Sequence, residues 1–307
     1  MPARRGGFRS LCNVAIMGAE VPIVPFPRMM TTVLVVAIGG LPVRAVDPPL
    51  ADVLARARAS VATWQPQLSG LVLEERYVQH LEMRHGGTGT MRLRSDVLLV
   101  RVKDAWVGFR DIAEVDGHPI AGRSRRLEDL FVSHPLAEAL LQARRISDEG
   151  SRYNLGTVYR NFNVPTTPLR LFEPDRAARV TFKLDAMTTR DNRHAAVVSY
   201  HEGQPPTLLL TLSEQPIHTS GKLWIDSASG QVLATEMQWR LAPPRDAGDL
   251  QAKVAVSYHE APEVHIFVPA EMTESYQTAD EIIDCHAEYT GVRRFTVAVT
   301  DDVSMPR

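Results

Sequence analysis

The clearest hydrophobic pattern in this chain lies between residues 221 and 240, where apolar and polar positions alternate in two runs. Five apolar residues mark these runs: Leu223, Ile225, Leu233, Met237 and Trp239. A period of two indicates β-strands that pack one face and leave the other largely wet. The residues between the runs, 226–230 (DSASG), have the short side chains and the glycine that a tight turn needs. The segment therefore predicts an antiparallel hairpin.

The first part of the chain predicts one helix and three strands. Apolar residues recur at helical spacing from residue 50 to about residue 65. Strand-like runs follow at 71–81, 90–102 and 106–115, and the first two flank the flexible loop 85–89 (HGGTG). We expect these three strands to form an antiparallel meander.

The period then changes from two to that of a helix. Residues 125–131 and 136–151 predict two helices, and three prolines punctuate a short irregular or helical stretch over 165–174. Strand-like runs occupy the rest of the chain: 180–185, 195–201, 208–213, 254–259, 270–277, 282–289 and 295–300. Strands, a helical insertion and more strands favour an α+β fold, mostly antiparallel β, in which one continuous sheet packs on helices.

This order of elements resembles the carrier fold of the outer-membrane lipoprotein localisation factors. The similar motifs are the hairpin 222–226 with 230–233, and an ending made of 268–272 (VPAEM), Tyr276 and 293–297 (RRFTV). From about residue 50 to residue 303 the chain also resembles a family of secreted bacterial proteins without an assigned function. The resemblance implies a curved, incomplete β-barrel, or half barrel, whose concave face is packed or lidded by helices. It implies no catalytic residues.

The N-terminal 45 residues are typical of a secretory signal peptide. An apolar run at 33–41 follows Arg28, and 43–45 (VRA) has small residues where a signal peptidase requires them. The run is too short to span a bilayer, which takes about 20 apolar residues. We expect 1–45 to be a leader and 46–307 to be a single β-rich domain that is periplasmic or secreted, without a transmembrane anchor after processing. The alternative is a disordered leader on a cytosolic protein.

Charge then narrows the choice of partners. Residues 1–45 contain five arginines and one acid, which leaves 29 basic and 35 acidic residues, a net charge of −6. A domain this acidic has no global attraction to nucleic acid, so we expect no nucleic-acid partner.

The best metal-like cluster is Asp284, His286 and Glu288, which share one face of a strand. An outward polar face explains the same residues without a metal, and we expect no metal and no cofactor. Cys285 lies on the other face of that strand, where we expect a small buried thiol.

Three charged groups are interpreted as solvated surface: Glu74–Glu75, Asp148–Glu149 and Arg123–Arg126. For the arginines, an acidic partner is the alternative. The chain has no GxSxG, P-loop or GxGxxG motif, so the sequence predicts no enzyme, with a hydrolase as the last alternative.

The function expected from the sequence is a non-enzymatic carrier or chaperone for a lipid or a lipidated partner. The alternative is an envelope interaction or sensor module with a protein partner and no lipid. For the carrier, the apolar lining of the concave face would comprise Val107, Phe109, Phe182, Leu223, Ile225, Leu233, Met237 and Trp239. If helices fill that face completely, the same residues form an ordinary core instead.

Overall fold

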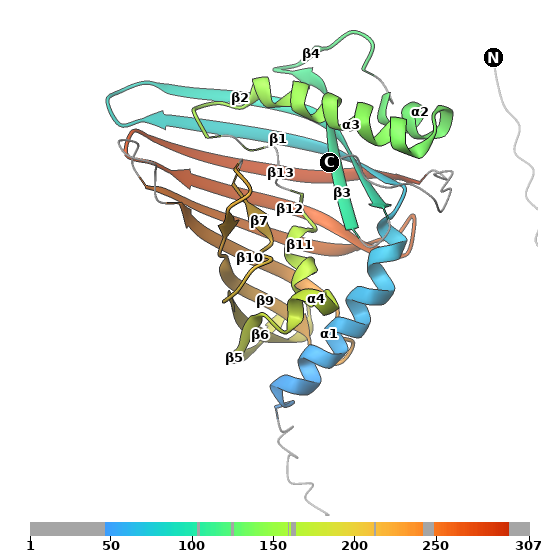
Figure 1. The fold of residues 1–307 in the computed structure, drawn as a ribbon, viewed down its shortest axis with the longest axis vertical. Helices are drawn as coiled ribbons and strands as arrows, with labels where there is room; N and C mark the ends of the chain where they lie inside the picture. The colour runs from blue at the N-terminus through green and yellow to red at the C-terminus, as the bar shows by residue number, and fades with distance from the viewer. Residues whose placement is uncertain are drawn as a thin grey trace, which may run out of the picture. The chain divides into compact units, whose positions relative to one another are not determined.

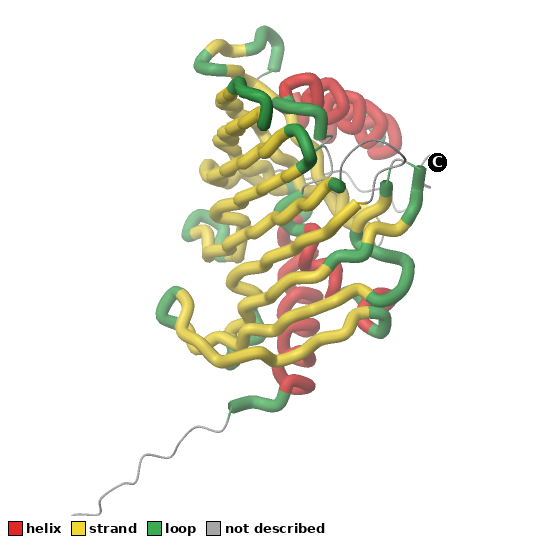
Figure 2. The backbone as a smooth tube through the Cα atoms, turned by 90° about the vertical axis from the view of Figure 1, so that its left-hand side faces the viewer, coloured by secondary structure: helices red, strands yellow, loops and turns green. Residues whose placement is uncertain are grey.

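The computed structural model describes residues 47–102, 105–123, 126–158, 160, 164–211, 213–241 and 249–294. All of them belong to one compact unit, Val46–Arg307. Its centre is an 11-stranded antiparallel sheet that curves but does not close, with strand order β4-β3-β2-β1-β13-β12-β11-β10-β9-β6-β5 (Figure 1). Figure 2 shows these strands as a single layer with a helix along one face. The expected α+β, mostly antiparallel fold is confirmed.

The strands of this sheet have the following bounds: β1 Leu71–Met83, β2 Thr88–Val102, β3 Ala105–Val115, β4 His118–Pro119, β5 Val180–Arg190, β6 Arg193–Glu202, β9 Ser220–Asp226, β10 Val232–Leu241, β11 Leu250–Ala261, β12 Ile266–Gln277 and β13 Glu281–Arg294. The helices are α1 Leu50–Trp64, α2 Arg126–Ser133, α3 Leu136–Gly150 and α4 Pro174–Ala177, with 3₁₀ turns η1 Gln65–Leu68, η2 Ser151–Tyr153 and η3 Thr167–Phe172. Within the part of the chain that the structure describes, no helix is long and apolar enough to cross a bilayer.

Pairing of β1 with β13 joins the two ends of the unit. Leu71 pairs with Arg294 at one end of this ladder and Met83 pairs with Glu281 at the other. Strands β1, β2 and β3 therefore extend the sheet that the later strands build, and all eleven strands share one continuous surface.

The main core lies on one face of the sheet, which we call the inner face. There α1 buries Val53, Ala57, Val61 and Trp64, and η3 adds a buried apolar set, Leu169, Leu171 and Phe172. The facing strand residues include Leu223 and Ile225, both fully buried. The helix pattern that the sequence predicted for residues 50–65 thus provides the element that covers the hairpin strands.

Helices α2 and α3 build a second core on the opposite, outer face of the sheet near β3. Along β2, Leu99 belongs to the main core whereas Leu98 and Val100 belong to the second one. Phe109 pairs with Leu98 and Val107 with Val100, so both point away from the inner face. The expectation that Val107 and Phe109 share a lining with the hairpin residues was wrong, because β3 presents them to α2, where Phe109 lies 5.9 Å from Phe131 between ring centroids.

The predicted hairpin is confirmed as β9 and β10, but a bulge changes its register. Ile225 pairs with Val232, and the register shifts between Val232 and Ala234. As a result Val232 joins the main core, and Leu233, although buried, does not. The assignment of Leu233 to the inner lining was wrong, because strict alternation fails where a strand carries one extra residue.

Two other strand predictions differ from the structure or lie beyond it. Of residues 208–213, only Leu209–Leu210 form a strand, β7, which pairs with β8 (Pro216–Ile217) in a separate two-stranded sheet. The run 295–300 lies outside the described residues.

The tip of the β9–β10 hairpin is fixed by one glycine that touches α1. Gly230 has a φ of +76°, and a side chain there would overlap the backbone carbonyl of Arg56. We predict that Gly230→Ala lowers the free energy of unfolding by about 1–2 kcal/mol from backbone strain and about 1–3 kcal/mol more from overpacking.

Gly117→Ala is the matched control, because Gly117 has a φ of +80° and open space around it. Urea unfolding of both variants measures the difference. Equal losses in the two variants would contradict the close contact between the hairpin and α1.

Candidate functional site

Polar side chains occupy the inner face where β1, β12 and β13 lie side by side. On β1, Glu75 and Gln79 are fully buried and Tyr77 is almost so. Glu274 on β12 and Glu281 on β13 are also buried. We call these residues, together with Arg110 on β3, the inner polar patch. It lies in the same layer as the apolar core.

Two charge-assisted contacts organise the inner polar patch. The Arg110 Nε atom lies 2.7 Å from Oε2 of Glu75, and Arg110 Nη2 donates to Oε1 of Glu75 at 2.8 Å. The Tyr77 hydroxyl donates to Glu274 Oε2 at 2.5 Å, and the Arg110 guanidinium lies 5.2 Å from the Tyr77 ring centroid. Arg110 and Glu75 thus share one charge-assisted hydrogen bond and one further close ion contact, whose two atoms, Arg110 Nε and Glu75 Oε2, have no hydrogen-bond partner among the described residues.

Burial and neighbouring charges fix the protonation of this patch. Burial raises the pKa of Tyr77 well above its ordinary value, and the nearby Glu274 carboxylate raises it further. Burial also raises the pKa of Tyr289, with Glu75 as the next cause. Burial by itself lowers the pKa of Arg110 and is the largest single cause, but Glu75, Tyr289, Tyr77 and Glu274 together outweigh it and the pKa is raised. The tyrosines therefore stay neutral donors and Arg110 stays a cation.

Residues 153–158 and Arg160, which we call the covering segment, lie over the patch and bond to it through polar groups. Gln79 donates through Nε2 to the Tyr153 carbonyl at 2.8 Å and accepts at Oε1 from the backbone N–H of Leu155 at 3.0 Å. Glu281 Oε1 accepts from the backbone N–H and the hydroxyl of Thr157 at 2.8 and 2.6 Å. The segment comes so close that a methyl group on Gly156 would lie 2.6 Å from Glu281 Oε2.

Arg160 places a buried guanidinium against the patch. The side chain is 1% exposed; it donates to Gln79 Oε1 and to the Leu155 carbonyl at 2.8 Å. It also lies 5.6 Å from the Tyr276 ring centroid. Within the described part of the chain no carboxylate lies within 4.0 Å of it, and its Nε atom and Oε2 of Glu281 are buried without a hydrogen-bond partner. Such unmet groups are costly and mark this cover as incomplete.

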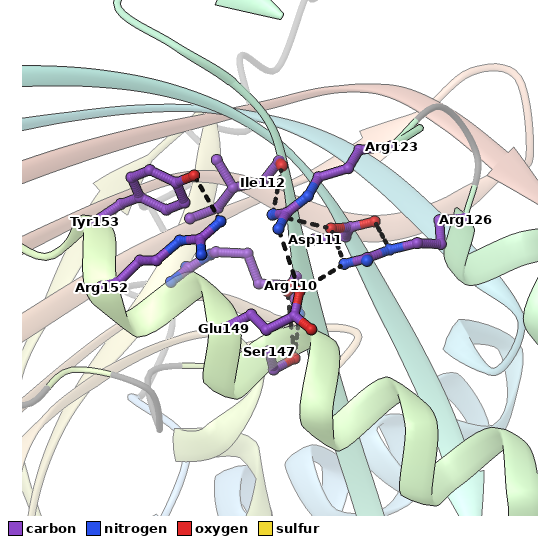
Figure 3. Close-up of polar contacts among 9 residues, drawn as sticks. All are labelled: Arg110, Asp111, Ile112, Arg123, Arg126, Ser147, Glu149, Arg152 and Tyr153. Carbon is purple, nitrogen blue, oxygen red and sulfur yellow. Dashed lines mark hydrogen bonds and ion pairs between the residues drawn. The ribbon is translucent and has the colours of Figure 1, made fainter. Parts of the chain in front are cut away.

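The outer side of β3 holds a second polar cluster, which anchors the helices (Figure 3). Asp111 is 2% exposed. Its Oδ2 atom accepts a hydrogen bond from Arg126 Nε at 3.0 Å, and its Oδ1 atom accepts one from Arg126 Nη2 at 2.8 Å. Arg123 is 8% exposed, donates to the Ile112 carbonyl and pairs with Glu149 at 3.2 Å. Arg123 and Arg126 are therefore not solvated charges awaiting an acidic partner. Their acidic partners belong to this chain.

Helix α3 also covers the free edge of β3. The Ser147 hydroxyl accepts from the backbone N–H of Arg110 at 2.9 Å and donates to its carbonyl at 3.3 Å (Figure 3). These bonds replace those of a missing neighbouring strand. Through Arg110 and Asp111, adjacent residues of β3 connect the inner patch and the outer helices.

The structure separates the residues that the sequence assigned to ligand binding. Leu223, Ile225, Met237 and Trp239 lie together in the main core, and Phe182 packs at its margin, with its ring 6.0 Å from that of Phe172 in η3. Val107, Phe109 and Leu233 do not join them. Helix α1 and η3 thus pack on the inner face with the apolar residues of the main core. The unusual feature of that face is the inner polar patch.

Sequence reasoning missed this patch. Glu75 was interpreted as a solvated charge together with Glu74, which was wrong for Glu75 because it is fully buried and paired with Arg110. The signal was present in the phase of the strand: Leu71 and Leu73 set the inward positions of β1, and Glu75, Tyr77 and Gln79 continue that phase.

The metal-like cluster and the cysteine lie as the strand period predicted. Asp284 and Glu288 are exposed and His286 is half-buried on the outward side of β13, and among the residues that the structure describes no group of His, Cys, Asp or Glu could hold a metal ion. Cys285 is a free thiol and is 4% exposed.

Comparison with known proteins adds likeness of fold only. No protein-family model matches the chain, and no curated protein matches it with significance. Among solved structures it is similar to a DUF1329 family protein from Desulfovibrio piger (TM-score 0.36, 8% identity, 81% of this chain and 95% of that one). It is also similar to an outer membrane lipoprotein-sorting protein domain from Vibrio parahaemolyticus (0.34, 10%, 80% and 95%).

A LolA superfamily protein from Nitrosomonas europaea is similar as well (TM-score 0.30, 9% identity, 80% of this chain and 93% of that one). The resemblance noted in the sequence is thus also found among solved structures. At such identities and TM-scores, these similarities assign no site residue and no ligand to this chain.

Cys285 provides a direct test of the register of β13. Burial, followed by the nearby Glu274, raises the pKa of its thiol to about 12. We predict labelling by a thiol reagent at pH 8.5 that is at least about 100-fold slower in the native protein than in urea, where the pKa returns to about 8.5.

The same shift predicts that the folded state binds the thiol proton more tightly, so its stability decreases as the pH rises above about 8.5. Stopped-flow labelling with and without denaturant measures the first effect, with Cys12→Ser removing the other thiol. Equal labelling rates would contradict the inward position of Cys285.

Proposed function

We propose that this protein is a non-enzymatic carrier that binds a lipid or a lipidated partner on its inner face, beneath the covering segment. The observation that carries the proposal is the inner polar patch, roofed by a segment whose bonds to it are polar and incomplete. An amphipathic ligand would place its polar end at the patch and its chain along the neighbouring apolar surface.

The energetics of buried charge support a binding role for the patch. Replacing a buried ion pair by apolar residues of similar size is often neutral or stabilising, so stability alone gives little reason to bury Glu75 with Arg110. Buried ionisable groups with specific charge partners are common where proteins bind or react with other molecules. The proposed role involves no chemical step, since a carrier needs only to hold and release.

The two halves of the inner face differ in how readily they could open. The apolar half is sealed by α1, and its opening would expose Val53, Val61 and Trp64 to water. The covering segment is held by hydrogen bonds from Gln79 and Glu281, which water can replace at a small net cost, and by Tyr153 and Val158, which are only partly buried against the main core. Ligand entry is therefore expected beside the covering segment.

An envelope interaction module without lipid is the second candidate. The observation in its favour is that α1 and η3 already pack on the apolar inner face, where Leu223 and Ile225 are fully buried. A protein of this kind would recognise its partner through an outer surface and leave the inner face closed. Uptake of a lipid separates the two candidates.

The carrier proposal is tested by opening the covering segment with one methyl group. The probe is a fluorescent monoacylglycerol, which is uncharged. We predict saturable uptake by the wild-type protein and uptake at least several-fold tighter by Gly156→Ala, because the added group would contact Glu281 and Ile283 at 2.6 Å and lift the segment.

Gly122→Ala is the control variant, since Gly122 has a similar φ of +72° and no neighbour within 4 Å. It should bind the probe as the wild type does. Absence of saturable uptake in wild type and Gly156→Ala alike would reject the carrier and favour the interaction module.

Action in the periplasm or outside the cell requires export, which the N-terminal pattern supports; residues 1–45 lie outside the described part of the structure. We predict cleavage after Ala45 and a product that begins at Val46. N-terminal sequencing of the protein from the periplasm or medium of a bacterial host measures this. A membrane-retained chain that still carries Met30 would contradict it.

A further inference from the structure

We infer that the ligand of the inner polar patch carries a positive charge at its polar end, and that Arg160 occupies the place of that charge in the structure described above. The inference rests on the proposed carrier function and makes it more specific. The ligand class is an amphipathic cation, with an apolar chain and a terminal ammonium or guanidinium group.

The charge of the strand residues favours a cation. The β-strands contribute three buried carboxylates to the patch, Glu75, Glu274 and Glu281, and one cation, Arg110, which is committed to Glu75 through two close contacts. Without Arg160, the patch has a formal charge of −2. An anionic headgroup at this position would be repelled by the Glu281 carboxylate, whereas a cationic one would be attracted to it.

The groups that surround the Arg160 guanidinium are of the kinds that bind cations. The guanidinium is met by the amide oxygen of Gln79, the carbonyl of Leu155 and the face of the Tyr276 ring. Amide oxygens and an aromatic face bind ammonium groups as well as guanidinium groups. Of these partners, Gln79 and Tyr276 belong to the sheet and remain when the covering segment leaves.

Arg160 is an imperfect occupant of this position. Its Nε atom has no acceptor, and Oε2 of Glu281 has no donor, although both are buried. A ligand cation that reached Oε2 of Glu281 would remove the second of these penalties, which the covering segment leaves in place. Arg160 would then be an internal competitor, and the ligand would have to displace it.

Three compounds that share a dodecyl chain test the inference: dodecylguanidinium, dodecyl maltoside and dodecyl sulfate, each used with the full chain below its micellar concentration. Isothermal titration should show dodecylguanidinium binding at least about tenfold tighter than dodecyl maltoside, as expected for one charged hydrogen bond. Dodecyl sulfate should bind most weakly. Sphingosine and palmitoyl-arginine amide then represent an aminolipid and a lipidated peptide, and tighter binding of either one identifies the natural source of the charge.

Variants separate the contributions of Glu281 and Arg160. Glu281→Gln should remove most of the preference for dodecylguanidinium over dodecyl maltoside, whereas Glu263→Gln, an exposed acid in the turn between β11 and β12, should leave it unchanged. Arg160→Met keeps the side-chain length without the charge, and should tighten the binding of dodecylguanidinium further. If Arg160→Met does not fold, as judged by circular dichroism, the Glu281 pair still decides.

The possible failures are distinct. If none of the dodecyl compounds or lipids binds, the carrier function itself is rejected. If dodecyl maltoside or dodecyl sulfate binds as tightly as dodecylguanidinium and Glu281→Gln has no effect, the carrier remains but the cationic ligand is rejected.

Discussion

The pairing of β1 with β13 is the contact on which the rest of this structure depends. It joins strands separated by about two hundred residues of chain and makes one sheet from two meanders. It also sets Glu75, Tyr77 and Gln79 of β1 opposite Tyr289, Ala287 and Cys285 of β13, and Glu274 of β12 lies opposite Cys285 on the other side. Neither meander alone contains the inner polar patch. The same long-range pairing therefore creates both the continuous sheet and the candidate site, and loss of this ladder would remove both together.

Placing charged groups inside the sheet imposes a second constraint, because each one needs a partner in the dry interior. Residues of the helices outside the sheet help to provide these partners, in addition to residues of the sheet itself. Ser147 of α3 bonds the backbone of Arg110, and Arg126 of α2 pairs with the adjacent Asp111. The α2–α3 pair thus holds β3 from its edge and its outer side, and so positions the cation that neutralises Glu75. The helical insertion α2–α3 therefore has a direct role in positioning the buried charge.

Most of the architecture could be predicted from the sequence, because hydrophobic period and turn chemistry are local properties. The alternation through Leu223 and Ile225 and the turn residues 226–230 defined the hairpin, and the helical spacing of Val53, Ala57 and Val61 defined α1. The errors came from effects that are not local. The bulge at Leu233 depends on the pairing of β10 with β9. The outward direction of Phe109 depends on the pairing of β3 with β2. Burial of Glu75 and Arg123 depends on partners 35 and 26 residues away. The sequence of a strand indicates on which face a charged residue lies. Its partner can be identified only once the pairing of the strands is known.

The inner face combines two solutions to the same problem of covering one side of an open sheet. Over β9, β10 and β11 the cover is α1, which packs through apolar side chains. Lifting α1 would cost free energy in proportion to the apolar area exposed to water. Over β1, β12 and β13 the cover is a segment bonded through Gln79 and Glu281, with Tyr153 and Val158 partly buried against the main core. Its hydrogen bonds exchange with water at a net cost of about 1 kcal/mol each. Within the described residues, the polar cover leaves Arg160 Nε and Glu281 Oε2 unsatisfied, and α1 likewise leaves Arg56 Nε unsatisfied, so both covers carry a penalty of this kind. In the proposed opening on the polar side, the sheet residues uncovered are carboxylates, an amide and an aromatic ring. In the proposed carrier, that set of groups, rather than the apolar core alone, would decide which ligand binds.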